Sequence, residues 1–188
     1  MEKYDSDNVV DSESVQDQNQ ARNIARHLAV LAQRTVKDKN MYLFLGQRTG
    51  LFAGNVKYLY LHFVQNVPQA SSFFLTRHDE VFSELRTAGL PVVMEHSPEA
   101  LQVAAQAGTV VVDTISFRNH LYSVLYSRAR QVQLWHGVGN KKIGFQLKGA
   151  SCLQGRDQTL IEDHSDYDVV VTTSPFYTKE VFRKSLDA

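Results

Sequence analysis

Cysteine is nearly absent from this sequence, and its scarcity excludes two common kinds of structural support. The 188 residues include one cysteine, Cys152, which cannot form a disulfide within the chain and suggests a reducing compartment. No group of cysteine and histidine residues has the spacing of a zinc site, so we expect no bound metal. Stability must therefore come from a hydrophobic core, which a chain with 43% hydrophobic residues can supply.

Long apolar runs are also missing. No stretch approaches the roughly 18 uninterrupted apolar residues of a membrane span. The acidic beginning of the chain lacks the basic and apolar regions of a signal peptide. These absences predict a cytoplasmic protein.

Net charge is zero over the whole chain, but it is unevenly distributed. Within residues 1–17 the only basic residue is Lys3, and the acidic residues are Glu2, Asp5, Asp7, Asp11, Glu13 and Asp17. We interpret residues 1–17 as a mobile acidic tail and residues 18–188 as the folded domain. The domain carries a net charge of +5 that balances the tail. This excess suits phosphorylated ligands or an anionic membrane surface and is too weak to indicate nucleic acid.

Short apolar runs alternate with amphipathic segments along the domain. The amphipathic pattern predicts a first helix over residues 18–35, whose basic residues suggest membrane or partner binding as the alternative to packing on the domain. Predicted strands cover residues 41–46, 71–77, 90–95, 109–114, 130–136 and 167–174. Predicted helices begin near Asn55 and cover residues 79–88, 97–107, 119–129 and 175–186. This order favours an α/β fold, a Rossmann-like, mostly parallel sheet with helices on both faces.

Ligands of such sheets bind outside the carboxyl ends of the strands. The loops expected at this edge are residues 46–55, 113–119, 136–148 and 173–175. The chain has no Gly-x-Gly-x-x-Gly element after a strand and no Walker lysine motif, so the sequence does not support an ordinary dinucleotide site or P-loop.

The richest loop begins in "VQLWHGVGNKKIGFQ". His136 directly follows a predicted strand, where an imidazole could act as a general base, and Gly137 would let a backbone amide approach an oxyanion. Lys141 and Lys142 could neutralise a phosphate. The alternative is a turn with a packed histidine and two solvated lysines.

A second polar loop offers Arg48, Asn55 and Lys57 as substrate-binding candidates. Asn55 could instead be only the N-cap of the helix that begins near it, which is the simpler interpretation without further context.

Three stretches in order resemble the CDP-glycerol glycerophosphotransferase family, the polymerases and primases of teichoic acid and related capsular polymers. They are "YLFLGQRTGLFAGNVKYLYLHF", "QLWHGVGNKKIGF" and "YDVVVTTSPFYTKEVFRKSL". The likeness covers residues 41–186, which corresponds to the N-terminal half of that family's two-domain GT-B architecture. The resemblance implies direct transfer of a polyol phosphate from a CDP-activated donor to a terminal hydroxyl, with no cofactor and no required protein-bound metal.

Within this resemblance, His136 matches the histidine that serves as base on the acceptor hydroxyl, and Lys142 matches the basic position after it. Asn55 and Lys57 match a Gly-Asn-x-Lys element on the acceptor side. Asp168 matches an aspartate for which a structural role is equally open, and Ser174 is a candidate for the same supporting role. Residues 138–140 read Val-Gly-Asn where many members have Thr-Pro, which leaves acceptor specificity open.

The resemblance places the donor-nucleotide site in a second domain, which is missing from this chain. We therefore expect the chain to be the acceptor-binding half of a longer enzyme or to need a partner, and to be inactive alone. Contact with the inner face of the cell membrane would fit an acceptor polymer of the envelope. Two alternatives stay open: a GT-B glycosyltransferase that uses a nucleotide-sugar, and a binding or regulatory module without catalysis.

Overall fold

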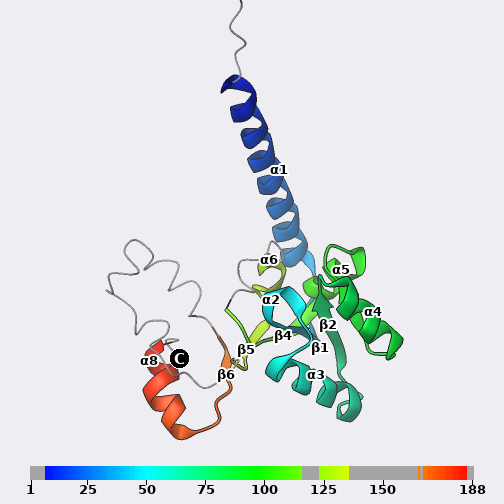
Figure 1. The fold of residues 1–188 in the computed structure, drawn as a ribbon, viewed down its shortest axis with the longest axis vertical. Helices are drawn as coiled ribbons and strands as arrows, with labels where there is room; N and C mark the ends of the chain where they lie inside the picture. The colour runs from blue at the N-terminus through cyan, green and yellow to red at the C-terminus, as the bar shows by residue number, and fades with distance from the viewer. Residues whose placement is uncertain (1–6, 116–122, 136–164, 166, 186–188) are drawn as a thin grey trace, which may run out of the picture.

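A single parallel sheet organises the molecule (Figure 1). The computed structural model describes residues 7–115, 123–135, 165 and 167–185. The strands are β1 (Asp38–Leu45), β2 (Ser71–Thr76), β3 (Val92–Met94), β4 (Ala107–Val112), β5 (Arg130–Gln133) and β6 (Val169–Val170). Their order in the sheet is β3-β2-β1-β4-β5-β6, and every neighbouring pair is parallel. The predicted Rossmann-like α/β fold is confirmed.

Helices follow the strands along the chain. They are α1 (Asp7–Arg34), α2 (Gln47–Gly50), α3 (Gly54–Asn66), α4 (Asp79–Thr87), α5 (Pro98–Gln106), α6 (Ser123–Tyr126), the π-helix η4 (Tyr177–Phe182) and α8 (Arg183–Ser185). Ser97 caps α5 as its sequence signature predicts, because its Oγ accepts a hydrogen bond of 3.0 Å from the amide of Ala100. No helix within the described residues is long and apolar enough to cross a membrane.

The two faces of the sheet are buried by different helices. Successive side chains of a strand point to opposite faces, so Leu43 and Leu45 join a core cluster with residues of α1, α5 and α6. Phe44, between them, joins the other cluster with residues of α3 and α4. The near-continuous apolar strands in the sequence are explained by burial on both faces.

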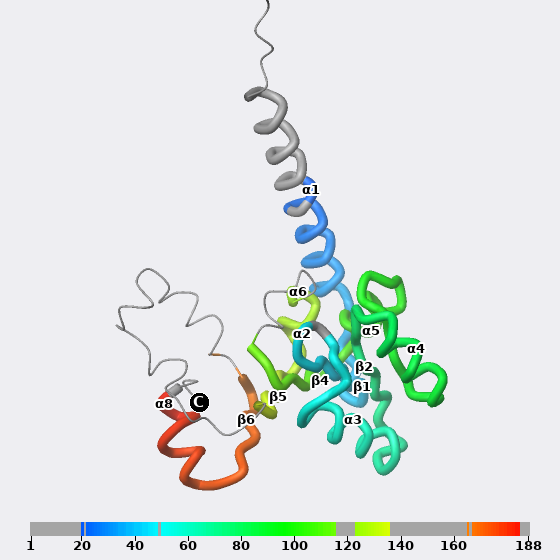
Figure 2. Tube along the Cα trace, viewed as in Figure 1, coloured from blue at the N-terminus to red at the C-terminus, as the bar shows by residue number. Residues whose placement is uncertain are grey.

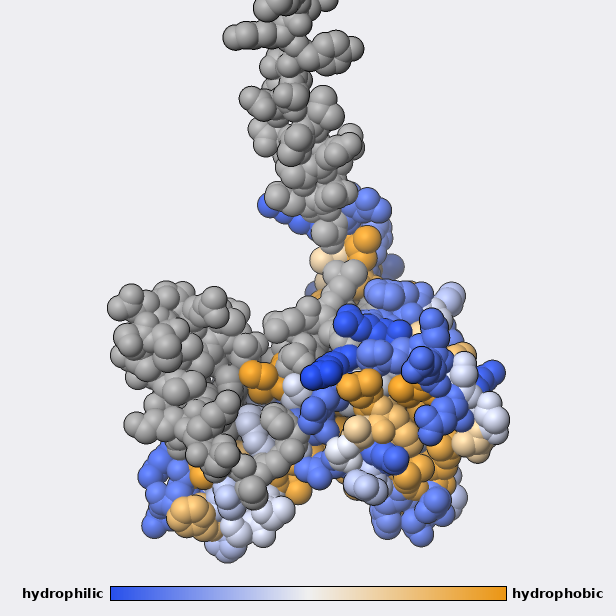
Figure 3. Space-filling view, viewed as in Figure 1, coloured by the Kyte–Doolittle hydropathy of each residue, from blue (hydrophilic) through white to orange (hydrophobic). Residues whose placement is uncertain are grey.

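The first helix differs from its predicted bounds. It begins at Asp7 rather than at residue 18, so helical backbone extends into the segment interpreted as a tail. Its C-terminal part packs on the domain through Leu28 and Ala32, and the Arg128 guanidinium donates to the carbonyl of Ala32 at 3.1 Å. The part of α1 from residue 20 onward runs toward the sheet, and its first turns stand away from the sheet and its covering helices (Figure 2). Hydrophobic residues gather on the surface where α1 meets the domain (Figure 3).

The C-terminal strands are shorter than predicted. β5 ends at Gln133 and β6 contains two residues. The chain leaves β6 because the Thr172 hydroxyl makes local hydrogen bonds, accepting from the amide of Ser174 at 3.2 Å and donating to its carbonyl at 2.8 Å. Of the helix predicted over 119–129, the structure describes α6, since residues 116–122 lie outside the described part.

Candidate functional site

The site is built where the strand order reverses. β1 and β4 are adjacent, and the chain leaves them toward opposite sides of the sheet, which is where open α/β sheets form a ligand crevice. The loop after β1 leads to α3, and the segments after β5 and β6 end at the same edge. Asn55, Trp135 and Thr172 come from these three segments and line one pocket of about 180 Å³. The loop after β1 and the segment after β6 share this edge with Trp135, whereas the predicted loop over residues 136–148 lies outside the described part of the chain.

The beginning of α3 is shaped by a buried carboxylate at the end of β4. Gly54 has a φ of +65°, a conformation that favours glycine. A β-carbon at Gly54 would lie 2.7 Å from Oδ2 of Asp113, whose side chain is fully buried. Negative charge is stabilised at a helix N-terminus. The protein itself therefore supplies a carboxylate, that of Asp113, at this end of α3.

Asn55 lies in the first turn of α3 and is not its N-cap, since the N-cap is Ala53. The predicted capping role is therefore wrong. Its side-chain Nδ2 donates instead to the carbonyl oxygen of Trp135 at 2.7 Å, with the carbonyl of Leu134 at 3.5 Å. This contact joins two polar loops that are 80 residues apart in the sequence.

Trp135 adopts a left-handed backbone conformation, with a φ of +58°. Its amide donates to Oε1 of Gln133 at 2.9 Å. Gln133 is fully buried, and its own Nε2 donates to the carbonyl of Thr114 at 3.4 Å. The indole is buried against Phe182 of η4, with ring centroids 5.7 Å apart and planes at 70°. A strained residue persists only where its surroundings hold it, and here they come from α3, β5 and η4.

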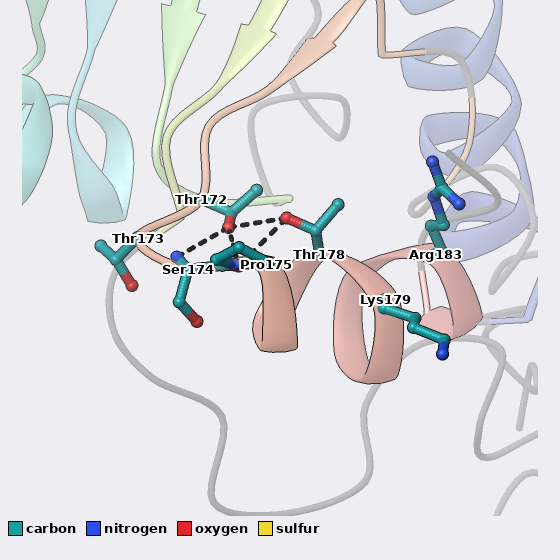
Figure 4. Close-up of a pocket in the computed structure, with 7 residues that line it drawn as sticks. All are labelled: Thr172, Thr173, Ser174, Pro175, Thr178, Lys179 and Arg183. Atoms are coloured by element: carbon teal, nitrogen blue, oxygen red, sulfur yellow. Dashed lines mark hydrogen bonds between the residues drawn. The ribbon is translucent and has the colours of Figure 1, made fainter.

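A second, more open hollow of about 580 Å³ adjoins this pocket through Thr172 and Thr173. Figure 4 shows Thr172, Ser174 and Thr178 joined by hydrogen bonds at the start of the last helix, with Lys179 and Arg183 further along it. Neither cation has an ion-pair partner in the part of the chain that the structure describes. The neighbouring Lys184 differs, because its Nζ lies 2.6 Å from the carboxylate of Glu180. Within the described residues, the hollow thus combines hydroxyl groups with two positive charges that have no acidic partner.

The other predicted site residues are distributed unevenly. His136, Gly137, Lys141 and Lys142 lie outside the described residues. Lys57 lies two residues after Asn55 in α3, with its Nζ 5.1 Å from the centroid of Phe52.

Arg48 belongs to the short helix α2 and has a φ of +46°. Its carbonyl accepts a hydrogen bond of 2.9 Å from Nε2 of His78. Among the described residues, no hydrogen bond or ion pair links Arg48 to Asn55, so these two candidates are not brought into direct contact.

Asp168 and Ser174 have structural contacts. Oδ2 of Asp168 accepts from the amide of Gln131 at 2.7 Å, and the amide of Asp168 donates to the carbonyl of Gln131 at 3.0 Å. These bonds hold the start of β6 on β5, at the end remote from the pocket. Ser174 accepts at its Oγ from the amide of Tyr177 at 3.3 Å and lines the open hollow.

Two residues of the site were missed at the level of sequence. Gln133 is a fully buried amide in a strand, and Asp113 is a fully buried carboxylate at a strand end. The signal for each was its polarity within an apolar run, because a buried polar group needs a partner. No group of three metal-ligating side chains occurs in the described ranges.

Comparison with known proteins adds family and fold. The family model described as CDP-Glycerol:Poly(glycerophosphate) glycerophosphotransferase matches residues 27–186. A comparison with curated protein sequences gave no significant match.

Several solved structures share the fold. The wall teichoic acid polymerase TagF superposes with a TM-score of 0.63 at 14% identity, over 99% of this chain and 46% of that one. A histidine-to-alanine variant of TagF gives 0.67 at 14%, over 99% and 45%. A variant soaked with CDPG gives 0.64 at 13%, over 99% and 47%. The chain spans just under half the length of these structures.

Proposed function

Because this chain belongs to the CDP-glycerol:poly(glycerophosphate) glycerophosphotransferase family, we propose that it is the acceptor-binding half of a polyol-phosphate transferase. The donor is CDP-glycerol or another CDP-activated polyol, and the acceptor is a hydroxyl of a cell-envelope polymer. The likeness to TagF, a wall teichoic acid polymerase, supports this reading of the fold.

One observation carries the proposal: the side chain of Asn55 bonds to the backbone directly before His136. The bond of 2.7 Å to the Trp135 carbonyl places the Gly-Asn-x-Lys element beside the Trp-His-Gly element. Thr172 and Thr173, from the third stretch, line the same pocket. A pocket of about 180 Å³ is smaller than the ≈ 300–1,000 Å³ of sites for drug-sized ligands, so it suits one polyol unit better than a nucleotide.

In the proposed reaction the His136 imidazole accepts the proton of the acceptor hydroxyl. The hydroxyl oxygen then forms a bond to the β-phosphorus of CDP-glycerol. The bond between this phosphorus and the bridging oxygen breaks, and CMP leaves with the electron pair. Backbone amides near Gly137, together with Lys141 and Lys142, would stabilise the charge on the transferred phosphoryl group.

Lys179 and Arg183 give the acceptor polymer a second contact in this proposal. They border the hollow that continues from the pocket. A poly(glycerophosphate) chain carries one negative charge per repeat, so a polymer whose end lies beside Asn55 would bring earlier phosphates toward these cations. Lys57 and Arg48 offer further positive charge at the same edge of the sheet.

The donor site belongs, in this proposal, to a second half that this domain meets in the active enzyme. Phosphoryl transfer depends on positioning and on neutralising the donor phosphates. Lysines on a wet surface contribute at most about 1 kcal/mol to such a contact. The domain alone is therefore expected neither to bind CDP-glycerol well nor to transfer polyol phosphate.

A reconstitution experiment tests the proposal. This domain is assayed alone and together with a second half supplied in the same chain or in trans, with CDP-glycerol and with nucleotide-sugars as donors. CMP release that needs both halves, CDP-glycerol and an acceptor is the expected result. Transfer from a nucleotide-sugar would favour a glycosyltransferase, and no transfer with any donor would favour a binding module.

Contact with a membrane is a separate part of the proposal. Arg22 and Arg26 are exposed on α1, as is part of Ile24. Such a helix can lie against anionic headgroups, which would place the domain on the cytoplasmic face of the membrane beside its polymer. Co-sedimentation with anionic but not with zwitterionic vesicles, weakened by Arg22→Glu and Arg26→Glu together, is expected. Equal sedimentation with both vesicles would contradict it.

A further inference from the structure

His136, the proposed base, is joined to the described part of the structure by its peptide bond with Trp135. A peptide unit is planar, so the carbonyl of Trp135 and the amide of His136 turn together. The hydrogen bond from Asn55 to this carbonyl, at 2.7 Å, therefore holds the carbonyl side of the peptide unit that leads to His136. No other side chain of α3 makes a described hydrogen bond to this peptide unit.

We propose that Asn55 is a positioning residue, which holds the Trp135 carbonyl directly before the proposed base and does not bind substrate. The inference rests on the proposed function, because it takes His136 as the base. It replaces the expectation that Asn55 lines the acceptor.

The chemistry of the amide supports this role. Among the described residues, the two groups that bond to the Asn55 side chain, the carbonyls of Trp135 and Leu134, are acceptors. The NH₂ group must therefore point toward them, and its two hydrogens are directed at the protein backbone. A substrate hydroxyl or phosphate would compete with the Trp135 carbonyl for the same donor.

The backbone conformation of Trp135 explains why its carbonyl needs the hydrogen bond from Asn55. A φ of +58° is unfavourable for a bulky residue. The Gln133 side chain holds the amide of Trp135 at 2.9 Å, and Phe182 packs on its ring. Asn55 holds the carbonyl, the part nearest to His136. Removing Asn55 would take away its hydrogen bond to the carbonyl while the contacts from Gln133 and Phe182 remain, so the fold should survive.

The variant Asn55→Asp separates positioning from binding. Aspartate has the same shape but accepts and does not donate, so it would repel the Trp135 carbonyl. A carboxylate could still accept a hydrogen bond from a substrate hydroxyl. Negative charge suits a helix N-terminus, but the Asp113 carboxylate already lies at this end of α3, so circular dichroism must show that Asn55→Asp keeps the helix folded. Asn55→Ser serves as a second, smaller variant.

Trp135 is the only tryptophan of the chain. Tryptophan fluorescence therefore reports directly on the surroundings of this residue. In the 188-residue protein, Asn55→Asp and Asn55→Ser should shift tryptophan emission to longer wavelength and increase its quenching by acrylamide at least twofold. Asn66→Ala is the matched control, because Asn66 lies at the other end of α3 and bonds to His62 on the same helix. Unchanged emission in both Asn55 variants would overturn the proposal.

Kinetics of the two-half enzyme provide the second arm. The expected result is a fall of at least tenfold in kcat for Asn55→Asp, with the acceptor KM within about twofold of wild type. A raised acceptor KM with normal kcat would make Asn55 a substrate contact and overturn the inference. If His136→Ala is inactive and the Asn55 variants are normal, the inference alone fails. If His136→Ala is active, the proposed function fails, and the fluorescence result still decides whether Asn55 holds Trp135 in place.

Discussion

The four strands β3-β2-β1-β4 and the two strands β5-β6 are held by different forces. The first region is buried on both faces by two large clusters of apolar side chains. The second contains strands of four and two residues and a small cluster built on Trp135 and Phe182. It is joined to the rest by the backbone pairing of β5 with β4 and by directional hydrogen bonds from Asn55 and Gln133. Apolar packing supplies rigidity without a defined direction, whereas these polar contacts hold Trp135, the residue directly before the proposed base.

The largest expected effect is in the apolar region. Phe44 is fully buried between Tyr60 and Phe63, with ring centroids 5.4 and 5.5 Å away. Phe44→Ala should lower the free energy of unfolding by about 3–5 kcal/mol. Phe182→Ala should cost less than Phe44→Ala, because its cluster is small and can relax around the gap. Urea unfolding followed by circular dichroism measures both, and equal losses would remove the contrast between the regions.

The next effect concerns chemistry in the polar region. In the two-half enzyme, His136→Ala should lower kcat about 100-fold or more while the unfolding midpoint stays near wild type, because general-base assistance is worth that much. His62→Ala, an exposed histidine of α3, is the control and should keep full activity. Wild-type turnover in His136→Ala would remove this residue from the mechanism.

Acceptor affinity should respond more weakly. The double variant Lys179→Ala and Arg183→Ala is expected to raise the acceptor KM about three- to tenfold, and the effect should shrink at high salt because these charges are exposed. Lys184→Ala is the matched control, since Glu180 already neutralises that lysine. If all three substitutions act alike, the hollow beside Thr172 has no special role in acceptor binding.

The smallest effect lies at the opposite end of the sheet. Lys37 precedes β1 and donates to the carbonyls of Leu125 at 2.7 Å and Ala104 at 3.3 Å. Burial, with a smaller contribution from Arg128, lowers the pKa of Lys37 to about 8 from 10.5. Between these values the unfolded chain binds more protons, so the folded state gains stability as pH rises.

The gain should be below about 1 kcal/mol, because Lys37 is only partly buried. Denaturation of wild type and Lys37→Met near pH 7 and near pH 9.5 tests it. The stability of wild type relative to Lys37→Met should increase with pH, and a constant difference would show that the pKa is not lowered. The comparison of the two proteins cancels other titrating groups, such as Tyr60, whose pKa burial raises.

Sequence pattern predicted the first region better than the second. Apolar runs such as Met41–Leu45 identified the strands, and Ser97 and Gly89 marked where helices begin and end. In the second region the predicted strand over 167–174 shrank to two residues, because the hydroxyl of Thr172 bonds locally in place of the sheet. The last helix was expected, but its π-helical turns were not.

For the candidate site, the sequence by itself determined which loops follow strands and which side chains those loops carry. It also contained the three stretches that resemble the family. The apolar and polar positions that mark strands and helices repeat every two to four residues, so they can be recognised within a short stretch of sequence. Only the tertiary structure decided that Asn55 bonds to a carbonyl 80 residues away and that Asp113 occupies the start of α3. Such pairings depend on the lateral order of the strands, and no local pattern of side chains encodes that order.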